Sequence, residues 1–211
     1  MNIRHFTLRS AFAAVLLAGL AAQMSAAPIC GSGAGWVSTC TAGDYALPWF
    51  ATGQINGGLS IGLDGTAVIR LGAPSAGTVA TEILSLSLAG PGVTLTLIGP
   101  PTLGLITQDI GDPNLADSFF DIFFELNIGP GLLLHNNVPA NLFAGGLTSW
   151  PTANTYSLTN APIQLFDNLN QPAGFLTAAG HTPNPEPFSV ILVTSGLAGM
   201  FFARKRLRSR D

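Results

Sequence analysis

Apolar and polar side chains alternate along several short stretches between residues 28 and 180. A period of two residues is that of a β-strand, because successive side chains of a strand point to opposite faces of the sheet. We find no amphipathic helical pattern of four turns in this region. The clearest stretch covers residues 118–128, whose apolar face consists of Phe120, Ile122, Phe124, Leu126 and Ile128. We therefore predict a strand with one face in a core and the other in water.

Three pairs of apolar stretches flank turn residues, and each pair is a predicted β-hairpin. The pairs are residues 84–88 and 93–97 around Pro91-Gly92, residues 59–63 and 67–71 around Asp64-Gly65, and residues 163–166 and 174–177. With 25 Gly and 15 Pro to supply turns, we expect seven to nine short strands. The predicted fold class is mainly β: one extracytoplasmic domain over residues 28–180, built as an antiparallel β-sandwich or jelly roll.

The N-terminal 27 residues have the order of a secretory signal peptide. Arg4 and Arg9 come first, the apolar residues 11–22 follow, and the small residues Ser25-Ala26-Ala27 come last. A positive, an apolar and a small-residue segment in this order are typical of a cleaved export signal. A signal anchor or a buried first helix stays open as an alternative.

The C-terminal region combines a short motif, an apolar segment and a basic end. Pro185-Glu186-Pro187 closes a proline-rich linker, residues 181–187, and leads into the apolar residues 188–203. As a helix this segment would measure about 24 Å, against about 30 Å of membrane hydrocarbon, so we predict a short transmembrane helix. The tail, residues 204–211, is expected in the cytoplasm because of its basic side chains, which are Arg204, Lys205, Arg206, Arg208 and Arg210.

This arrangement resembles a PEP-CTERM sorting signal, which occurs on exported proteins of Gram-negative bacteria that make exopolysaccharide or biofilm matrix. The resemblance implies recognition of Pro185, Glu186 and Pro187 by exosortase, a membrane-embedded protease-transpeptidase, and removal of the tail. It also implies an inner-membrane precursor and a product at the cell envelope, at the cell surface or in the extracellular matrix, with exopolysaccharide as a possible partner. A permanently anchored single-span protein is the alternative.

Charge is distributed unevenly along the chain. Between residues 10 and 203, Arg70 is the only basic residue against ten Asp and Glu. Such an acidic middle offers no surface for a phosphate backbone, so nucleic-acid binding is not expected.

Two small groups of residues are candidates for structural chemistry. Cys30 and Cys40 are the only cysteines, and export to an oxidising compartment predicts a disulfide between them. The acidic residues Asp109, Asp112 and Asp117 supply oxygen ligands of the kind that calcium prefers, although their spacing is not that of an EF-hand. The competing interpretation is a polar loop without a metal, and we expect no other cofactor.

No sequence motif predicts an enzyme. There is no Gly-x-Ser-x-Gly, phosphate loop or zinc motif. We therefore expect a non-enzymatic protein whose β-domain has a structural or adhesive role. The alternative is a carbohydrate-active or calcium-dependent enzyme, for which Asp121 and Glu125 are the candidate carboxylates. The Trp and Tyr residues are candidates for sugar stacking if they are exposed.

Overall fold

The computed structural model describes residues 29–183, which form twelve strands and one short 3₁₀ helix, η1 (Trp36–Thr39). The strands are β1 (Gly43–Ile55), β2 (Leu59–Leu71), β3 (Thr78–Gly90), β4 (Val93–Leu97), β5 (Thr102–Gln108), β6 (Ala116–Ile122), β7 (Phe124–Ile128), β8 (Leu133–Asn136), β9 (Ala140–Leu147), β10 (Tyr156–Leu158), β11 (Ile163–Phe166) and β12 (Pro172–Pro183). The prediction of a mainly antiparallel β-fold is confirmed.

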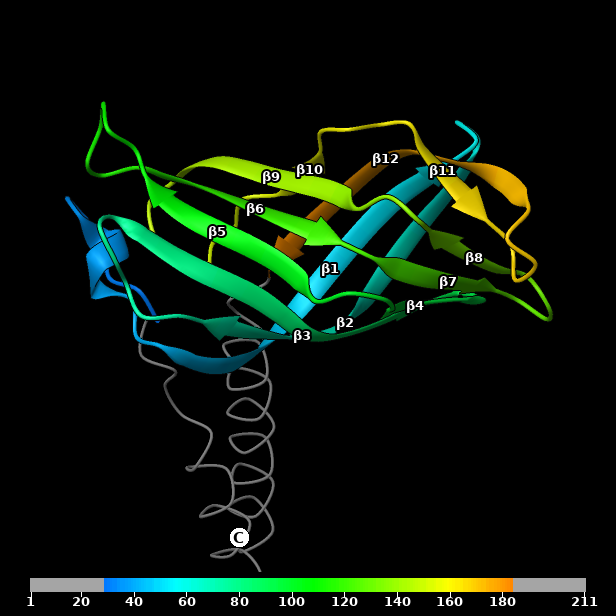
Figure 1. The fold of residues 1–211 in the computed structure, drawn as a ribbon, viewed down its shortest axis with the longest axis horizontal. Coiled ribbons are helices and arrows are strands. Elements are labelled where there is room, and N and C mark those ends of the chain that lie inside the picture. Colours follow the sequence, from blue (N-terminus) through cyan, green and yellow to red (C-terminus); the bar gives the residue numbers. More distant parts are fainter. Residues whose placement is uncertain (1–28, 184–211) are drawn as a thin grey trace, which may run out of the picture.

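All twelve strands belong to one sheet, which closes on itself (Figure 1). β12, the last strand, pairs antiparallel with β1, the first, from Trp49↔Pro183 to Ile55↔Leu176. The two separate sheets of the predicted sandwich are therefore not found. Both architectures bury one face of every strand, so alternation of apolar residues is the same in each and does not reveal the hydrogen-bond partners.

Consecutive short strands follow one another along the same path. β5 pairs with the first half of β3, and β4 pairs with its second half. In the same way, β6 pairs with β5 and β7 pairs with β4. β8 with β9 and β10 with β11 repeat this arrangement. If each of these four pairs counts as one interrupted strand, the sheet has eight strands in chain order, an up-and-down meander. The structure therefore has more strands than the seven to nine expected, because four of its strands are each interrupted once.

Two of the three predicted hairpins are present. β3 and β4 meet at Gly90↔Val93, and Gly92, with φ of 73°, takes the left-handed conformation that glycine supplies after proline in a tight turn. β11 and β12 pair as expected. The hairpin at Asp64-Gly65 is wrong, because β2 continues through these residues and pairs with β1 along its whole length. Gly65 serves close packing instead: a Cβ there would lie 2.0 Å from the Ser87 carbonyl oxygen.

The inward face of the closed sheet is the core. The strand predicted over residues 118–128 is interrupted at Phe123, yet its alternation persists and buries Phe120, Ile122, Phe124 and Leu126. The three tryptophans lie in the same core, each no more than 2% exposed. The predicted assignment of the apolar face in this region is thus confirmed.

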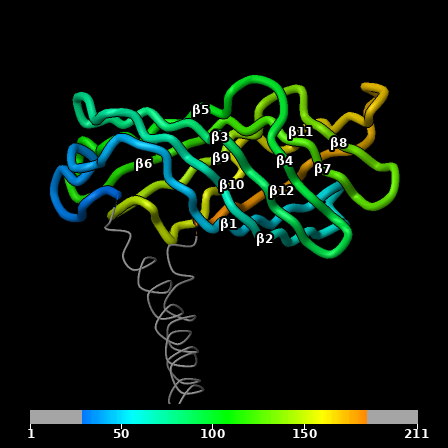
Figure 2. Tube along the Cα trace, turned by 90° about the horizontal axis from the view of Figure 1, so that it is seen from below, coloured from blue at the N-terminus to red at the C-terminus, as the bar shows by residue number. Residues whose placement is uncertain are grey.

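The folded domain extends beyond its predicted end at Gly180. β12 continues to Pro183, and His181, which was assigned to the linker, is a buried core residue. The first and last described residues lie on the same side of the domain (Figure 2). The predicted signal peptide, the Pro185-Glu186-Pro187 motif, the apolar segment 188–203 and the basic tail lie outside the described residues. Within residues 29–183 no helix has the length and apolarity needed to cross a membrane.

Candidate functional site

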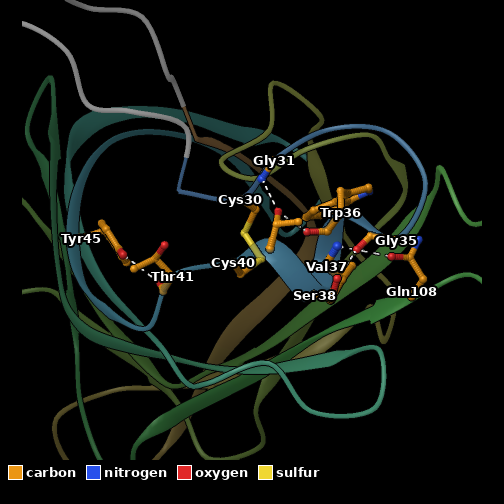
Figure 3. The surroundings of a disulfide bond; sticks show 11 residues. Cys30, Gly31, Gly35, Trp36, Val37, Ser38, Cys40, Thr41, Tyr45 and Gln108 are labelled. Atoms are coloured by element: carbon orange, nitrogen blue, oxygen red, sulfur yellow. Dashed lines mark hydrogen bonds between the residues drawn. A yellow bond between two sulfur atoms is a disulfide. The ribbon is translucent and has the colours of Figure 1, made fainter.

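A disulfide-linked loop covers one end of the closed sheet (Figure 3). Cys30 and Cys40 form the predicted disulfide on either side of η1, and Trp36 of η1 is fully buried. Backbone hydrogen bonds attach this cap to the sheet and its loops: the Cys30 N–H donates to the Trp150 carbonyl at 3.1 Å, and the Gly35 N–H donates to the Pro113 carbonyl at 2.7 Å. The cap therefore closes this end with an aromatic side chain.

An aromatic layer lies next to the cap inside the sheet. The ring of Trp49 stacks on Tyr156 with centroids 6.3 Å apart, and Tyr156 also contacts Phe120 at 5.3 Å. The indole N–H of Trp49 donates a hydrogen bond of 2.9 Å to Nδ1 of His181. β1, β6, β10 and β12 each contribute one member of this layer, so only closure of the sheet brings the four side chains together.

The bond from Trp49 determines the protonation state of His181. An indole nitrogen is a donor only, so Nδ1 must accept, and the proton of the neutral ring sits on Nε2. Complete burial lowers the pKa of His181 from 6.5 to about 4, since charge is costly in an apolar surrounding. At neutral pH the ring is thus uncharged, and no hydrogen-bond partner for its Nε2–H is found among the described residues.

Polar atoms without partners gather near the capped end. Six such buried side-chain atoms occur in the described part of the chain: Trp36 Nε1, Thr81 Oγ1, Thr102 Oγ1, Ser118 Oγ, Trp150 Nε1 and the Tyr156 hydroxyl. The Tyr156 hydroxyl lies near Ser118 and Trp150, at geometries outside those of a hydrogen bond. Burial raises the pKa of Tyr156 to about 12 and outweighs these two neighbours. This half of the interior is therefore tightly filled but incompletely hydrogen-bonded.

A cavity lies on the other side of the aromatic layer. Its walls contain the small residues Ala51, Gly53, Ala140 and Ala179, and His181 lines it at the aromatic layer. Apart from His181 and the exposed Thr52, all lining side chains are apolar. The cavity is partly open to solvent, and the space available to the centre of a water-sized sphere is about 20 Å³. His181 is thus the one buried polar side chain in an otherwise apolar lining.

The acidic residues predicted as calcium ligands do not converge on one point. Asp109 Oδ1 accepts the Gly111 N–H at 2.6 Å, and Asp112 Oδ1 accepts the Asn114 N–H at 2.9 Å. Asp117 Oδ1 accepts the N–H of Gly146, a residue of β9, at 3.2 Å. The hydrogen bonds that Asp112 accepts from the backbone and the side-chain amide of Asn114 lower its pKa. No group of three His, Cys, Asp or Glu able to hold a metal ion is present in residues 29–183. The carboxylates of Asp109 and Asp112 thus accept hydrogen bonds from the backbone of their own loop.

The remaining candidate residues are also separated. Asp121 is hydrogen-bonded to Asn141 on the outer face of the sheet, and Glu125 belongs to the next strand, β7. Burial of all three tryptophans and of Tyr156 leaves only Tyr45 partly exposed, and its hydroxyl donates to the Thr41 carbonyl. Stacking of these residues on sugars is therefore not supported.

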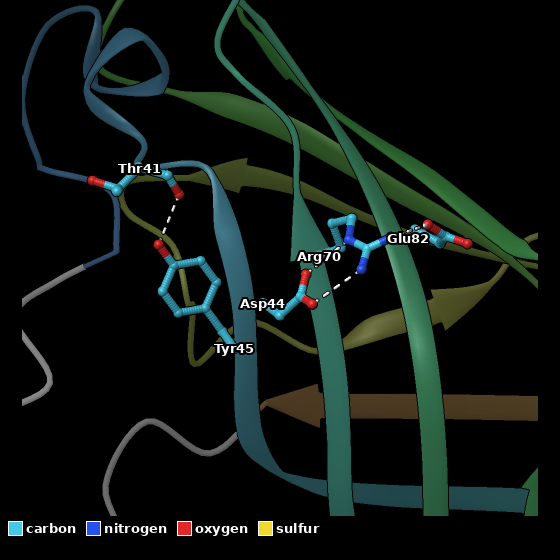
Figure 4. A network of polar contacts seen from close by, with 5 residues as sticks. All are labelled: Thr41, Asp44, Tyr45, Arg70 and Glu82. Atoms are coloured by element: carbon cyan, nitrogen blue, oxygen red, sulfur yellow. Dashed lines mark hydrogen bonds and ion pairs between the residues drawn. The ribbon is translucent and has the colours of Figure 1, made fainter.

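Arg70 takes part in a surface ionic network (Figure 4). Its guanidinium donates two hydrogen bonds to Asp44, of 2.8 and 3.0 Å. The Nη1 atom of Arg70 also lies 3.7 Å from Oε2 of Glu82. The bonds from Arg70 lower the pKa of Asp44. The three side chains come from neighbouring strands at a solvated surface, where the one guanidinium lies between two carboxylates.

Sequence reasoning missed the buried residues Trp49, Tyr156 and His181 as a group. Each occupies an ordinary inward position of a strand, and they are far apart along the chain. The local signal was weak, because the buried positions of β12 change from Leu176 to His181 and Pro183 across a register shift and do not follow one alternation.

Comparison with known proteins indicates the fold alone. No family model and no curated protein matches the chain. Among solved structures, the chain is similar to DynF from the dynemicin biosynthesis pathway of Micromonospora chersina, with a TM-score of 0.58 and 18% sequence identity. The match covers 78% of this chain and 88% of that chain. The two proteins thus share a fold over most of their lengths.

Proposed function

We propose that this chain is an exported, non-enzymatic protein of the cell envelope or extracellular matrix of a Gram-negative bacterium that makes exopolysaccharide. Exosortase sorts and cleaves it through its C-terminal signal. The observation that carries this proposal is the order of Pro185-Glu186-Pro187, the apolar residues 188–203 and the basic residues that follow. A short membrane segment behind a proline-rich linker suits presentation of an extended peptide to a membrane-embedded protease.

Two features of the folded domain support export. The Cys30–Cys40 disulfide closes the loop of the cap, and such bonds persist in oxidising compartments. The described chain also begins and ends on one side of the domain (Figure 2). Segments that precede and follow it can therefore approach one membrane surface together.

An adhesive role is supported by apolar side chains on the outer face of the sheet. Leu105, Phe119 and Phe143 are aligned across β5, β6 and β9 by the strand register. Phe119 is 39% exposed and Phe143 is 42% exposed. Neighbouring exposed aromatic side chains are typical of surfaces that contact another molecule.

The sorting proposal is tested by the mass of the mature protein from its native host. We expect the wild-type envelope form to lack residues 204–211, and a variant with alanine at Pro185, Glu186 and Pro187 to retain them. Retention of the basic tail by the wild-type protein would mean a permanent anchor and contradict processing.

The adhesive role is tested separately with the variant F119S/F143S. We expect it to fold normally but to be released from the matrix fraction, because it loses exposed apolar area without changing the core. F175S, which removes another exposed aromatic side chain, is the matched control. Equal release of both variants, or of neither, would show that this row of side chains has no special part in attachment.

A further inference from the structure

The interior cavity next to His181 combines a polar group with an apolar wall. The Trp49 indole occupies Nδ1, so His181 can offer only an Nε2–H donor. His181 lines a cavity whose other buried side chains are apolar. Its Nε2 is not one of the fully buried atoms without a partner, but it has no hydrogen-bond acceptor among the described residues, so an acceptor brought by a ligand can bind it.

Water is a poor occupant of this cavity. About 20 Å³ for the centre of a water-sized sphere is enough room for roughly one molecule. An ordered internal water, however, needs two to four polar partners, and here the buried side chains supply one. The backbone of the surrounding strands is already paired within the sheet.

A charged head group is also disfavoured. His181 is uncharged at neutral pH, and no basic side chain lines the cavity. An anion would lose its hydration without gaining an opposite charge, and an ammonium group would place donor against donor. The chemistry that fits is a neutral acceptor oxygen attached to a hydrocarbon.

We propose that the cavity binds a slim aliphatic molecule with one neutral acceptor oxygen, such as a ketone, aldehyde, ester or alcohol, with its oxygen on His181 Nε2–H. The hydrocarbon lies between the small side chains Ala51, Ala140 and Ala179. Because the cavity is narrow, an unbranched chain of few carbons enters first, and longer chains require the flexible leucines Leu126, Leu142 and Leu176 to change rotamer.

An isosteric pair of probes tests this assignment. 2-Butanone and 2-methyl-1-butene have the same shape, and only the ketone carries an acceptor. We expect the purified domain to bind both and to prefer the ketone. In H181M, which lacks the donor, the ratio of the two dissociation constants should fall by about tenfold, the size of one buried hydrogen bond. In H181Q, whose amide can donate, the preference should return.

A second variant tests the cavity without touching His181. A140V fills part of the space with two added carbons, and we expect it to weaken binding of both probes by tenfold or more while the domain stays folded. H135Q, at a half-buried histidine that does not line the cavity, should bind like the wild type. Absence of binding by the wild-type domain, an unchanged preference in H181M, or full binding by A140V would each overturn the proposal. None of these outcomes bears on sorting of the C-terminus, which is measured by mass.

Discussion

The two halves of the interior use the same strands differently. On the capped side, the large side chains of Trp36, Trp150, Tyr156 and Phe120 are all fully buried, and three of their polar atoms have no hydrogen-bond partner. On the other side, Ala51, Gly53, Ala140 and Ala179 leave a cavity. Side-chain size along one continuous inward face thus decides where a closed sheet is solid and where it is hollow.

His181 lies at the boundary between these halves. It belongs to the aromatic layer through its hydrogen bond with Trp49, and it is also one of the residues that line the cavity. The filled half holds the histidine in one tautomer, and the hollow half provides space in front of it. We therefore expect substitutions in the capped half and in the half with the cavity to change the stability of the domain by different amounts.

The largest effect is expected from emptying the capped half. Trp36→Ala removes a fully buried aromatic side chain that closes the end of the sheet, and we expect a loss of about 3–5 kcal/mol in the free energy of unfolding. Urea denaturation measures it. A loss below about 1 kcal/mol would mean that the cap does not contribute to the core.

Acid should destabilise the domain through the boundary residue. The folded-state pKa of His181, about 4, lies below its ordinary 6.5, so the unfolded chain takes up the proton first. The stability contributed by His181 is therefore complete above about pH 6.5 and is lost as the pH falls towards 4, by about 3 kcal/mol in total.

Denaturation curves measured across this pH range in wild type, H181Q and H135Q test the acid effect. We expect the slope between about pH 6.5 and 5 to disappear in H181Q, which keeps an acceptor for Trp49, and to persist in H135Q. An unchanged slope in H181Q would assign the acid sensitivity to other groups.

The cap disulfide should have a somewhat smaller effect. Reduction, or the variant C30S/C40S, releases a short loop in the unfolded chain, and we expect a loss of about 2–3 kcal/mol. The unfolding midpoint with and without reductant measures it. The unfolding midpoint of C30S/C40S should not change with reductant. If the midpoint of the wild type did not change either, the disulfide would not stabilise the cap.

The smallest effect is expected from filling the hollow half. In A140V the added methyl groups enter existing space, so the change in stability should stay within about 1 kcal/mol. A loss as large as that of Trp36→Ala, measured in the same urea series, would show that both halves are packed equally and would remove the contrast between them.

Local patterns predicted much of the strand structure because burial of one face imposes alternation. Phe120, Ile122 and Leu126 were assigned inward for this reason, and Gly92 marked a true turn. The same reasoning failed at Gly65, because a close approach between strands also selects glycine. It failed at Leu84 too, which alternation placed on the inward face together with Leu86 and Leu88. The pairing of β2 with β3 shifts by one residue between Val68 and Ile69, so Ile83 and Leu86 are buried and Leu84 is not.

The amino-acid sequence alone specified the β-class, the cysteine pair available for a disulfide, the acidic middle and the C-terminal arrangement on which the sorting proposal rests. These are properties of composition and of neighbours along the chain. Tertiary structure decided that the strands form one closed sheet, that the carboxylates of the acidic loop bind their own backbone, and that His181 faces a cavity. Each of these depends on pairing between residues far apart in the sequence, most directly that of β1 with β12, and no local pattern encodes which distant strand will complete the hydrogen bonds of another.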